Sequence, residues 1–312
     1  MSMSDGSVCL LEPLGLLSIR GPDSRRFLQG QLSNNVDELA GTAALPADAA
    51  ERTLLRAGLH NPQGRTLAVL GLLAAGPDQV LAVLPRELVG ITRATLQRYV
   101  LRSKVALTDE SDTHRLYGLT RPAATPGALS VRYAGARHLL VLSADQAAPL
   151  GEALPYEAWH AADVAAGLPQ IYAASSGQFI AQMLNLDCIG AVSFTKGCYT
   201  GQEVIARAHY RGRVKRRMQR FISREPLQLS PGESGEFSAG GTFRVVDSVQ
   251  HADGRCEFLA VTTLPGAAAE TGTSTDTSTE RAPASSDAAE APAPAGQRVT
   301  ASALPLPYPL PD

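Results

Sequence analysis

The chain has 312 residues, of which 44% are hydrophobic and 19% are charged. This length allows two or three compact domains with a full hydrophobic core, and the composition excludes a chain that is disordered throughout. The formal net charge of −2 gives no sign of a polyanionic partner. No apolar run approaches the roughly 18 residues that span a bilayer, and residues 1–6 lack the apolar core of a secretion signal. We therefore expect a cytoplasmic protein without a membrane partner.

The first part of the chain predicts strands with a helix between them. Residues 16–19 read as a short strand, and the turn residues at 21–23 (Gly-Pro-Asp) begin a helix. Two apolar runs, at 53–59 and 66–73, flank a strong turn signal at 61–64 (Asn-Pro-Gln-Gly). This arrangement predicts a β-hairpin.

A third apolar run, at residues 80–84, leads through Pro85 into a predicted helix over residues 86–102. Three strands followed by a helix imply an α+β layer. We expect the buried face of the helix to carry the residues that recur at helical spacing, which are Leu88, Ile91, Thr95 and Val100.

The middle of the chain repeats this pattern, and the C-terminal part departs from it. Strands are predicted at 129–133 and 138–142, followed by a helix over 156–166 that ends at Gly167. After Lys215, short apolar runs alternate with glycine and proline turns, as is typical of a small β-barrel. These runs are residues 220–222, 241–246, 258–262 and 299–306.

The sequence thus predicts an α+β fold in three parts and an insertion. Residues 1–47 and 113–217 are expected to form one discontinuous α+β domain, residues 48–112 a second, and residues 218–265 with 297–312 the barrel. Residues 266–296 hold five acidic side chains against one arginine and contain no Val, Ile, Leu, Met or aromatic residue. Because such a segment cannot bury enough apolar surface to offset the entropy of ordering, we predict a disordered acidic insertion there.

The cysteines give no sign of a metal site. Cys9, Cys188, Cys198 and Cys256 lie far apart, and none belongs to the closely spaced pairs that zinc and iron–sulfur sites use. A long chain without a secretion signal favours free thiols over disulfides. We expect four free thiols and no metal held by this chain alone.

The residues with the most chemical potential lie at 196–203 (Lys-Gly-Cys-Tyr-Thr-Gly-Gln-Glu), which we call the motif segment. Thr200 and Glu203 have the spacing of a capping box, in which each side chain accepts a hydrogen bond from a free backbone N–H at the start of a helix. We therefore predict a helix that begins at Gly201 and stops at Gly212.

Cys198 lies two residues before this predicted cap, near the positive end of the helix dipole, and Lys196 lies two residues further back. Both neighbours favour a thiolate, which predicts a reactive Cys198. The alternative is that Cys198 is a small buried apolar residue.

Residues 194–203, continued by Ala206, Arg207, Arg211 and Gly212, resemble the signature of the YgfZ family. A run of this length with such unusual residues is specific. Shorter segments extend the resemblance over most of the chain, at residues 21–24, 29–31, 165–169, 176–180 and 306–308. The signature residues other than Lys196 and Cys198 are Gly197, Tyr199, Thr200, Gly201, Gln202, Glu203, Arg211 and Gly212.

The resemblance implies a fold and a cellular role. The fold is that of the aminomethyltransferase (T-protein) of glycine cleavage, with two ferredoxin-like α+β domains and a small β-barrel in a ring that binds tetrahydrofolate in its centre. The role is support of iron–sulfur cluster assembly or repair in client enzymes. One such client is a tRNA methylthiotransferase, through which the family affects tRNA modification.

The resemblance also points to candidate folate contacts. Trp159 stands where the family places a folate-contacting tryptophan, and its flat indole suits stacking on a pterin. Leu14 stands where a relative has a second tryptophan and offers an apolar contact. Glu203 is a candidate for the pterin edge, and Arg207 or Arg211 for the glutamate tail. The alternatives are a core role for Trp159 and a solvated i,i+4 ion pair for the charged residues.

Two other functions remain open from the sequence. T-protein catalysis needs an aspartate on the strand after the early hairpin, but Ala68 and Val69 stand there, and neither moves a proton. We therefore do not expect conventional transferase catalysis. A basic run resembles a weak tRNA-binding signal, although we expect the link to tRNA to be indirect; the run comprises Arg211, Arg213, Lys215, Arg216, Arg217 and Arg220. We expect a monomer in which bound folate controls partner access to the Cys198 thiolate.

Overall fold

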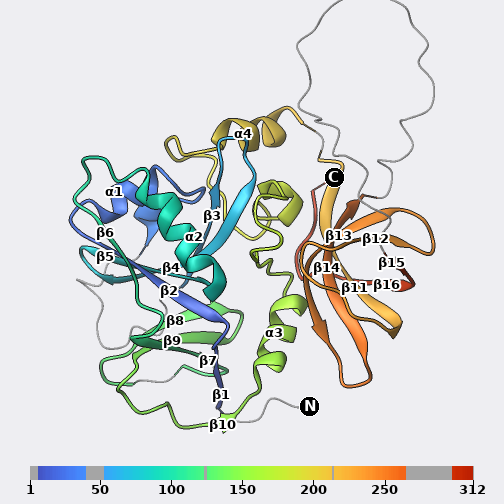
Figure 1. Cartoon of the computed structure of the whole chain (residues 1–312), viewed down its shortest axis with the longest axis horizontal. Helices are drawn as coiled ribbons and strands as arrows, with labels where there is room; N and C mark the ends of the chain where they lie inside the picture. Colours follow the sequence, from blue (N-terminus) through green and yellow to red (C-terminus); the bar gives the residue numbers. More distant parts are fainter. Residues whose placement is uncertain (1–5, 40–52, 123–124, 213, 265–296, 312) are drawn as a thin grey trace, which may run out of the picture.

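The computed structural model describes residues 6–39, 53–122, 125–212, 214–264 and 297–311. These residues form three β-sheets, of which two lie together on one side of the molecule and the third on the other. Helix α3 (Tyr156–Ala165) lies between the two sides (Figure 1). The predicted α+β class is confirmed.

The first sheet, which we call the hairpin sheet, has the strand order β3-β4-β5-β2-β6. The predicted hairpin is present, with β3 and β4 paired antiparallel and Gly64 in the left-handed region (φ +73°) at their turn. Glycine adopts that backbone angle more easily than any other residue, which explains the glycine of the turn. The strands are β2 (Leu14–Arg20), β3 (Leu55–His60), β4 (Thr66–Gly76), β5 (Gln79–Pro85) and β6 (Ala106–Asp109).

Two α-helices accompany this sheet. Helix α1 (Ser24–Gln29) follows β2, and the 3-10 helix η1 (Val36–Glu38) comes next. Helix α2 (Arg86–Gln97) packs on β2 and β6 and ends five residues earlier than predicted. Its predicted face is right at Leu88, which is buried, and wrong at Ile91, which is 53% exposed. The buried residues are Leu88, Val89, Thr92 and Leu96, so the apolar face is rotated away from the one that the spacing indicated.

The second sheet, the N-terminal sheet, has the order β10-β1-β7-β9-β8. Helix α3 follows it and stops where predicted, since Gly167 has a φ of +62° just after the helix. Sequence reasoning found only two of the five strands. The strands are β1 (Ser7–Leu10), β7 (His114–Leu119), β8 (Leu129–Ala134), β9 (Arg137–Ser143) and β10 (Glu152–Ala153).

The C-terminal sheet has six strands in the order β15-β12-β13-β14-β11-β16. Its end strands β15 and β16 are separated only by Thr300, and this one segment pairs with β12 at one edge of the sheet and with β11 at the other. The sheet is therefore curled into a half-barrel, which supports the predicted barrel in its coarser form (Figure 1). Phenylalanines 221, 243 and 258 fill its interior. The strands are β11 (Arg216–Pro226), β12 (Ser234–Phe237), β13 (Thr242–Gln250), β14 (Arg255–Thr263), β15 (Gln297–Val299) and β16 (Ala301–Leu304).

Strand pairing departs from the predicted division at one place. Strand β2 pairs with β5 and β6, so residues 14–20 share a sheet with strands of residues 55–109 instead of those of 113–217. The domain boundaries themselves stay a prediction. The acidic insertion predicted at 266–296 lies outside the described residues, and its flanking strands β14 and β15 belong to one sheet.

The main hydrophobic core joins the hairpin sheet to the face of the C-terminal sheet opposite to the phenylalanines of its interior. It runs from Leu17 of β2 through Leu184 and Tyr199 to Met218 and Leu259. The motif segment contributes Tyr199 to this core, so it is held in place by packing from several elements. No helix among the described residues has the length and apolar character needed to cross a bilayer.

Candidate functional site around the motif segment

The motif segment enters helix α4 (Gln202–Tyr210) through a left-handed glycine. Gly201 occupies the N-cap position with a φ of +81°, and no side chain caps the helix. The predicted capping box of Thr200 and Glu203 is therefore wrong. A Cβ on residue 201 would lie 2.5 Å from the carbonyl oxygen of Asn61, so the close approach to the β3–β4 turn requires glycine. The helix begins one residue too late for Thr200 to cap it.

The same turn also holds the first residues of α4. A Cβ on Gly64 would lie 2.8 Å from the Cβ of Val204, and Ile205 is fully buried. The Gln182 side-chain amide donates a hydrogen bond of 2.7 Å to the Ile205 carbonyl. Helix α4 is thus fixed to the hairpin on one side and to the turn before Asn185 on the other.

Tyr199 anchors the middle of the motif segment. It is 7% exposed, and its ring lies 6.3 Å from the ring of His60. Burial lowers the pKa of His60 to about 3, so its imidazole is neutral. The Nδ1 atom of His60 lies 3.3 Å from the Thr66 hydroxyl, and its Nε2 atom has no hydrogen-bond partner among the described residues.

Lys196 ties the motif segment to residues 29–34. Its ammonium donates hydrogen bonds to the carbonyl oxygens of Gln29 (2.7 Å), Leu32 (2.7 Å) and Asn34 (2.9 Å). Burial lowers the pKa of Lys196 to about 8, and the charge of Asp37 opposes this change. Because all three ammonium hydrogens are donated to carbonyls, Lys196 acts as a structural anchor for the segment.

Cys198 projects from this anchored segment. It is exposed, whereas Cys9 and Cys256 are buried and Cys188 is partly buried. Burial raises the pKa of these three other thiols to about 11. Gly197 before it is also exposed, and a Cβ there would meet nothing within 4 Å. Cys198 is thus the most accessible thiol of the four, and its reactivity stays a prediction.

The charged residues of α4 face solvent. Glu203 and Arg207 form an ion pair of 3.3 Å, with their side chains 87% and 56% exposed. Arg211 and Gly212 after the helix are also exposed, while Thr200 before it and Gln202 at its start are partly buried. The predicted contacts of Glu203, Arg207 and Arg211 with folate stay predictions. The geometry observed is the solvated i,i+4 pair.

Trp159 lies on α3, points into the hydrophobic core and is 1% exposed. The guanidinium carbon of Arg137 lies 4.7 Å from the indole centroid, and the ring of Tyr133 lies 5.4 Å away. A Cβ on Gly118 would lie 2.5 Å from the indole, so only glycine fits there. The indole N–H has no hydrogen-bond partner among the described residues. The predicted contact of Trp159 with folate stays a prediction.

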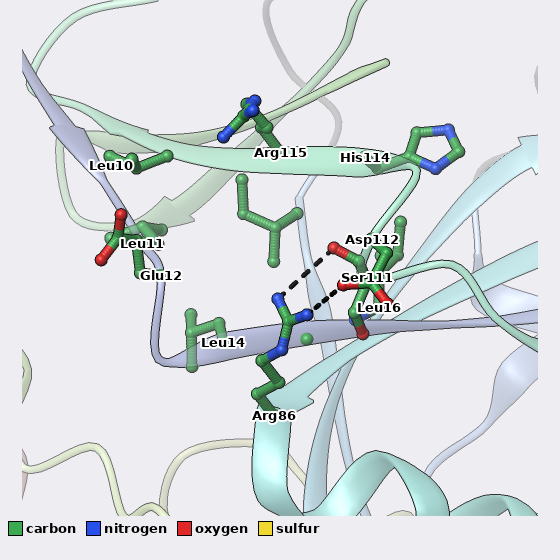
Figure 2. A pocket seen from close by; sticks show the side chains of 12 residues that line it. Leu10, Leu11, Glu12, Leu14, Leu16, Arg86, Ser111, Asp112, His114 and Arg115 are labelled. Carbon is green, nitrogen blue, oxygen red and sulfur yellow. Dashed lines mark hydrogen bonds and ion pairs between the residues drawn. The ribbon is translucent and has the colours of Figure 1, made fainter. Parts of the chain in front are cut away.

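Leu14 lines a pocket of about 380 Å³ at the junction of the hairpin and N-terminal sheets (Figure 2). Leu16 shares the apolar wall, while Arg86 reaches across to Asp112 and the carbonyl of Ser111. Trp159 does not line this pocket, although it belongs to the same hydrophobic cluster as Leu14. The structure therefore places the two predicted folate contacts in one core region without bringing both to the pocket.

Comparison with known proteins places the chain in a family, although no family model matches it. It is 31% identical over 279 residues to the tRNA-modifying protein YgfZ of Cronobacter sakazakii, covering 78% of this chain and 81% of the relative. It is 32% identical over 278 residues to the protein of the same name from Klebsiella pneumoniae, with the same coverage. The chain belongs to the YgfZ family.

A solved structure confirms the fold. The glycine cleavage system aminomethyltransferase T of Bartonella henselae matches with a TM-score of 0.62 over 83% of this chain and 79% of that chain. Its sequence is 11% identical, so the likeness concerns the fold alone. The expected relation between the YgfZ family and the aminomethyltransferase fold is thus confirmed.

Two of the segments that carry the family resemblance, residues 165–169 and 306–308, are far apart in sequence but in contact in the structure. The Tyr308 hydroxyl donates a hydrogen bond of 2.7 Å to the Gly167 carbonyl. A Cβ on Gly167 would lie 2.7 Å from a methyl carbon of Leu306 and 2.8 Å from the Tyr308 hydroxyl. The C-terminal residues therefore pack on the end of α3, which explains the glycine at 167.

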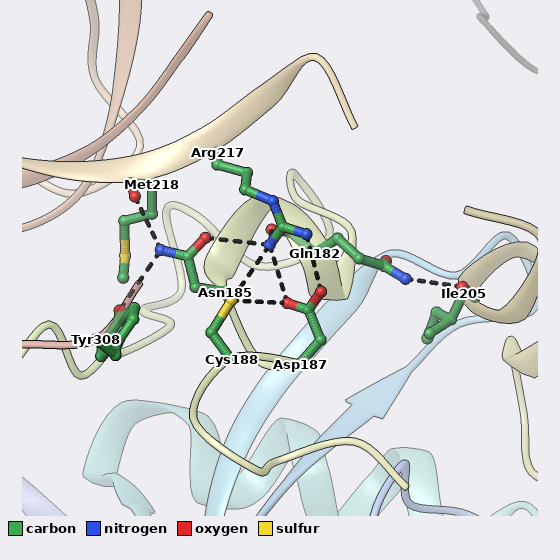
Figure 3. A network of polar contacts seen from close by, with 8 residues as sticks. All are labelled: Gln182, Asn185, Asp187, Cys188, Ile205, Arg217, Met218 and Tyr308. Carbon is green, nitrogen blue, oxygen red and sulfur yellow. Dashed lines mark hydrogen bonds and ion pairs between the residues drawn. The ribbon is translucent and has the colours of Figure 1, made fainter. Parts of the chain in front are cut away.

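Sequence reasoning missed a buried polar network that joins the motif region to the C-terminal sheet (Figure 3). Arg217, 4% exposed, donates hydrogen bonds of 3.0 and 2.9 Å to the two carboxylate oxygens of Asp187. It also donates 3.0 Å to the Gln182 carbonyl, and Asn185 donates 2.8 Å to the Met218 carbonyl. A positive φ of 56° at Asn185 places its amide there, which no sequence pattern indicated.

The basic run predicted as a weak tRNA signal is divided by this network. Arg217 is buried, and Arg220 pairs with Glu257 at 2.7 Å. Arg213 lies outside the described residues, which leaves Arg211 and Lys215 as the described members that are exposed. Because side chains alternate along β11, a run of cations in sequence does not form one surface.

The position expected for a catalytic aspartate is apolar and closed. Ala68 is fully buried and Val69 is 6% exposed in β4. Within the described parts of the chain, no group of three or more His, Cys, Asp or Glu side chains could hold a metal ion.

Proposed function

We propose that this YgfZ-family protein binds folate and supports iron–sulfur cluster assembly or repair in client enzymes, and thereby tRNA modification. The observation that carries the proposal is the exposed Cys198 on a segment whose neighbours Lys196, Tyr199 and Gly201 are all fixed. The tRNA role comes from the YgfZ relatives, which are named tRNA-modifying proteins. The finer architecture, a ring of two ferredoxin-like units and the half-barrel, and a cytoplasmic monomer belong to the same proposal.

The pocket beside Leu14 is the folate site in this proposal. Its volume of about 380 Å³ lies within the roughly 300–1,000 Å³ typical of ligand pockets. Leu14 and Leu16 offer an apolar wall to the flat rings, and Arg115 offers positive charge to the glutamate carboxylates, whereas Arg86 is already paired with Asp112. Bound folate supplies a one-carbon carrier or a conformational signal. The residues of this chain hold and orient it.

Cys198 is the reactive thiol in this proposal. A fixed segment presents its thiol to a partner in one orientation. Little entropy is therefore lost when the partner docks. Docking of the partner on Cys198 thus does not require a moving lid. The client is an enzyme with an iron–sulfur cluster, and partner access to Cys198 is controlled by folate.

T-protein-like aminomethyl transfer is the second candidate function. The matching fold favours it, but fold alone does not give activity. Ala68 and Val69 offer no proton-transfer group on β4. Formation of ammonia and methylene-tetrahydrofolate from an aminomethyl-lipoyl carrier would establish this function instead of ours.

A tetrahydrofolate titration followed by Trp159 fluorescence and by calorimetry tests the folate site. Trp159 is the only tryptophan of the chain and shares a core cluster with Leu14, so we expect a saturable change in its emission. Leu14→Asp should weaken binding strongly, because it places a charge on the apolar wall. Trp159→Phe serves as a signal control and should keep the calorimetric binding heat. The absence of saturable heat with the unaltered protein would refute folate binding.

Complementation of a deletion strain tests the thiol. We expect Cys198→Ser to lose cluster-enzyme activity and tRNA methylthiolation, and the matched Cys188→Ser variant to keep both. Both proteins should show equal folate binding in the calorimetric titration. Full activity with Cys198→Ser would end the proposal for thiol chemistry and leave the folate proposal intact.

A further inference from the structure

A second pocket lies where α1 meets the residues that follow α2. Its volume is about 340 Å³. The proposed function makes no use of it. The residues that line it and bear on its chemistry are Asp23, Arg26, Phe27, Gln31, Tyr99 and Arg102.

Positive charge at this pocket is largely uncompensated. Arg26 and Arg102 are exposed, and neither makes an ion pair or a side-chain hydrogen bond with any described residue. Asp23 is the acidic group of the lining, and its carboxylate accepts a hydrogen bond of 2.7 Å from the Lys104 backbone N–H. The side chains of Arg98 and Lys104 are exposed beside the lining residues in sequence. Unpaired guanidinium groups are strong ligands for phosphate oxygens.

The pocket also offers groups that suit a nucleobase. Tyr99 is 39% exposed and Phe27 is 6% exposed, and both line the pocket. The amide oxygen of Gln31 is buried and has no hydrogen-bond partner among the described residues. Because this oxygen has no accessible surface, the group that a base can reach is the ring of Tyr99, and an accessible aromatic ring suits the face of an unstacked base.

We propose that this pocket binds one nucleotide of a single-stranded nucleic acid. Arg26 and Arg102 contact its phosphates, and the Tyr99 ring stacks on the base. Arg98 and Lys104 extend the positive charge beyond a single phosphate, which favours a strand over a free nucleotide. An acidic protein surface would satisfy the arginines but offers no base face for Tyr99.

The position of the pocket connects it to the motif segment. Gln31 lines the pocket, and the neighbouring carbonyls of Gln29 and Leu32 accept two of the hydrogen bonds from Lys196. A strand bound there lies against the loop that anchors the motif. This site is separate from the basic run at 211–220, whose Arg217 and Arg220 are used internally.

Fluorescence anisotropy with a labelled single-stranded RNA about ten nucleotides long tests the proposal on the full chain. We expect the double variant Arg26→Gln/Arg102→Gln to bind at least about tenfold more weakly, with the slope of log affinity against log salt reduced by roughly 1.4 for two phosphate contacts. Tyr99→Ala should weaken binding about fivefold or more, because it removes one stacking platform. Arg93→Gln, an exposed arginine of α2 outside the lining, is the matched control and should bind as the unaltered protein does.

Several results would overturn the proposal. One is an absence of RNA binding by the unaltered protein at low salt, and another is an equal loss in the double variant and in Arg93→Gln. Displacement of the RNA by an equal concentration of a glutamate peptide would assign the site to an acidic protein. Displacement by an equal concentration of a mononucleotide would assign it to a free nucleotide. Melting curves check that the variants fold. We expect them to fold, because the substituted side chains are exposed.

Discussion

Replacing Lys196 with methionine tests whether this residue anchors the motif segment. Hydrogen bonds from a charged donor contribute about 1.5–3 kcal/mol each, so the three to carbonyl oxygens contribute on the order of 6 kcal/mol. The pKa lowered from 10.5 to about 8 reflects an opposing burial cost, which solvent around this partly buried ammonium reduces to about 2 kcal/mol. Ordering the long side chain costs about 2 kcal/mol more. We therefore expect Lys196→Met to lower the free energy of unfolding by about 1–3 kcal/mol.

Urea unfolding followed by Trp159 fluorescence measures the global change. Hydrogen exchange of the backbone amides at residues 29–34 and 196–203 measures the local change. The exchange rate of these amides should rise in Lys196→Met. Lys215→Met is the matched control, because Lys215 is exposed. The anchoring argument fails if both variants have the same unfolding free energy and the same exchange in these segments.

Three further predictions concern the packing around the site. Arg217→Met should cost about 3–5 kcal/mol in urea unfolding, since it leaves a buried carboxylate unpaired, whereas Arg255→Met breaks an exposed pair and should change little. Gly201→Ala should cost about 2–4 kcal/mol through its positive φ and its contact with the hairpin turn, while Gly197→Ala, which has open space, should melt normally. Burial lowers the pKa of His160, but the hydrogen bond and the charge of Asp247 outweigh this effect and raise the pKa above its ordinary value. Its stabilisation is present below about pH 6.5 and is lost as the pH rises through the folded-state pKa, so His160→Gln should lower the melting temperature more at about pH 6 than at about pH 8. Equal losses at both pH values would contradict this assignment.

The parts of the fold that the sequence predicted are those with strong local signals. The β3–β4 hairpin follows from the turn residues at 61–64, and the end of α3 follows from Gly167. In both places the backbone angle needed is one that glycine adopts without strain, so a few neighbouring residues decide the structure. The family segments likewise led to the correct family and fold because they are long and specific.

The parts that failed depend on contacts between distant residues. The spacing of Thr200 and Glu203 is that of a capping box, yet the carbonyl of Asn61 requires a left-handed glycine at 201 and moves the helix start past Thr200. Likewise, Ile91 fits the helical spacing, but the sheet beneath α2 covers Val89 and leaves Ile91 53% exposed. Local patterns cannot indicate which side of an element its neighbours will cover.

Charge in the sequence and charge on the surface also differ, and this difference bears on function. The cations at 211–220 are adjacent in sequence, but β11 turns Arg217 inward to Asp187 and pairs Arg220 with Glu257. Arg26 and Arg102 are separated by much of the hairpin sheet in sequence, but the fold brings them to one pocket, where neither forms an ion pair with a described residue. Cations whose charge is satisfied within the fold are poor ligands for an external phosphate, because binding would first have to break the internal pair. The surface to test for a nucleic acid is therefore the one beside α1, which shares the loop anchored by Lys196 with the motif segment.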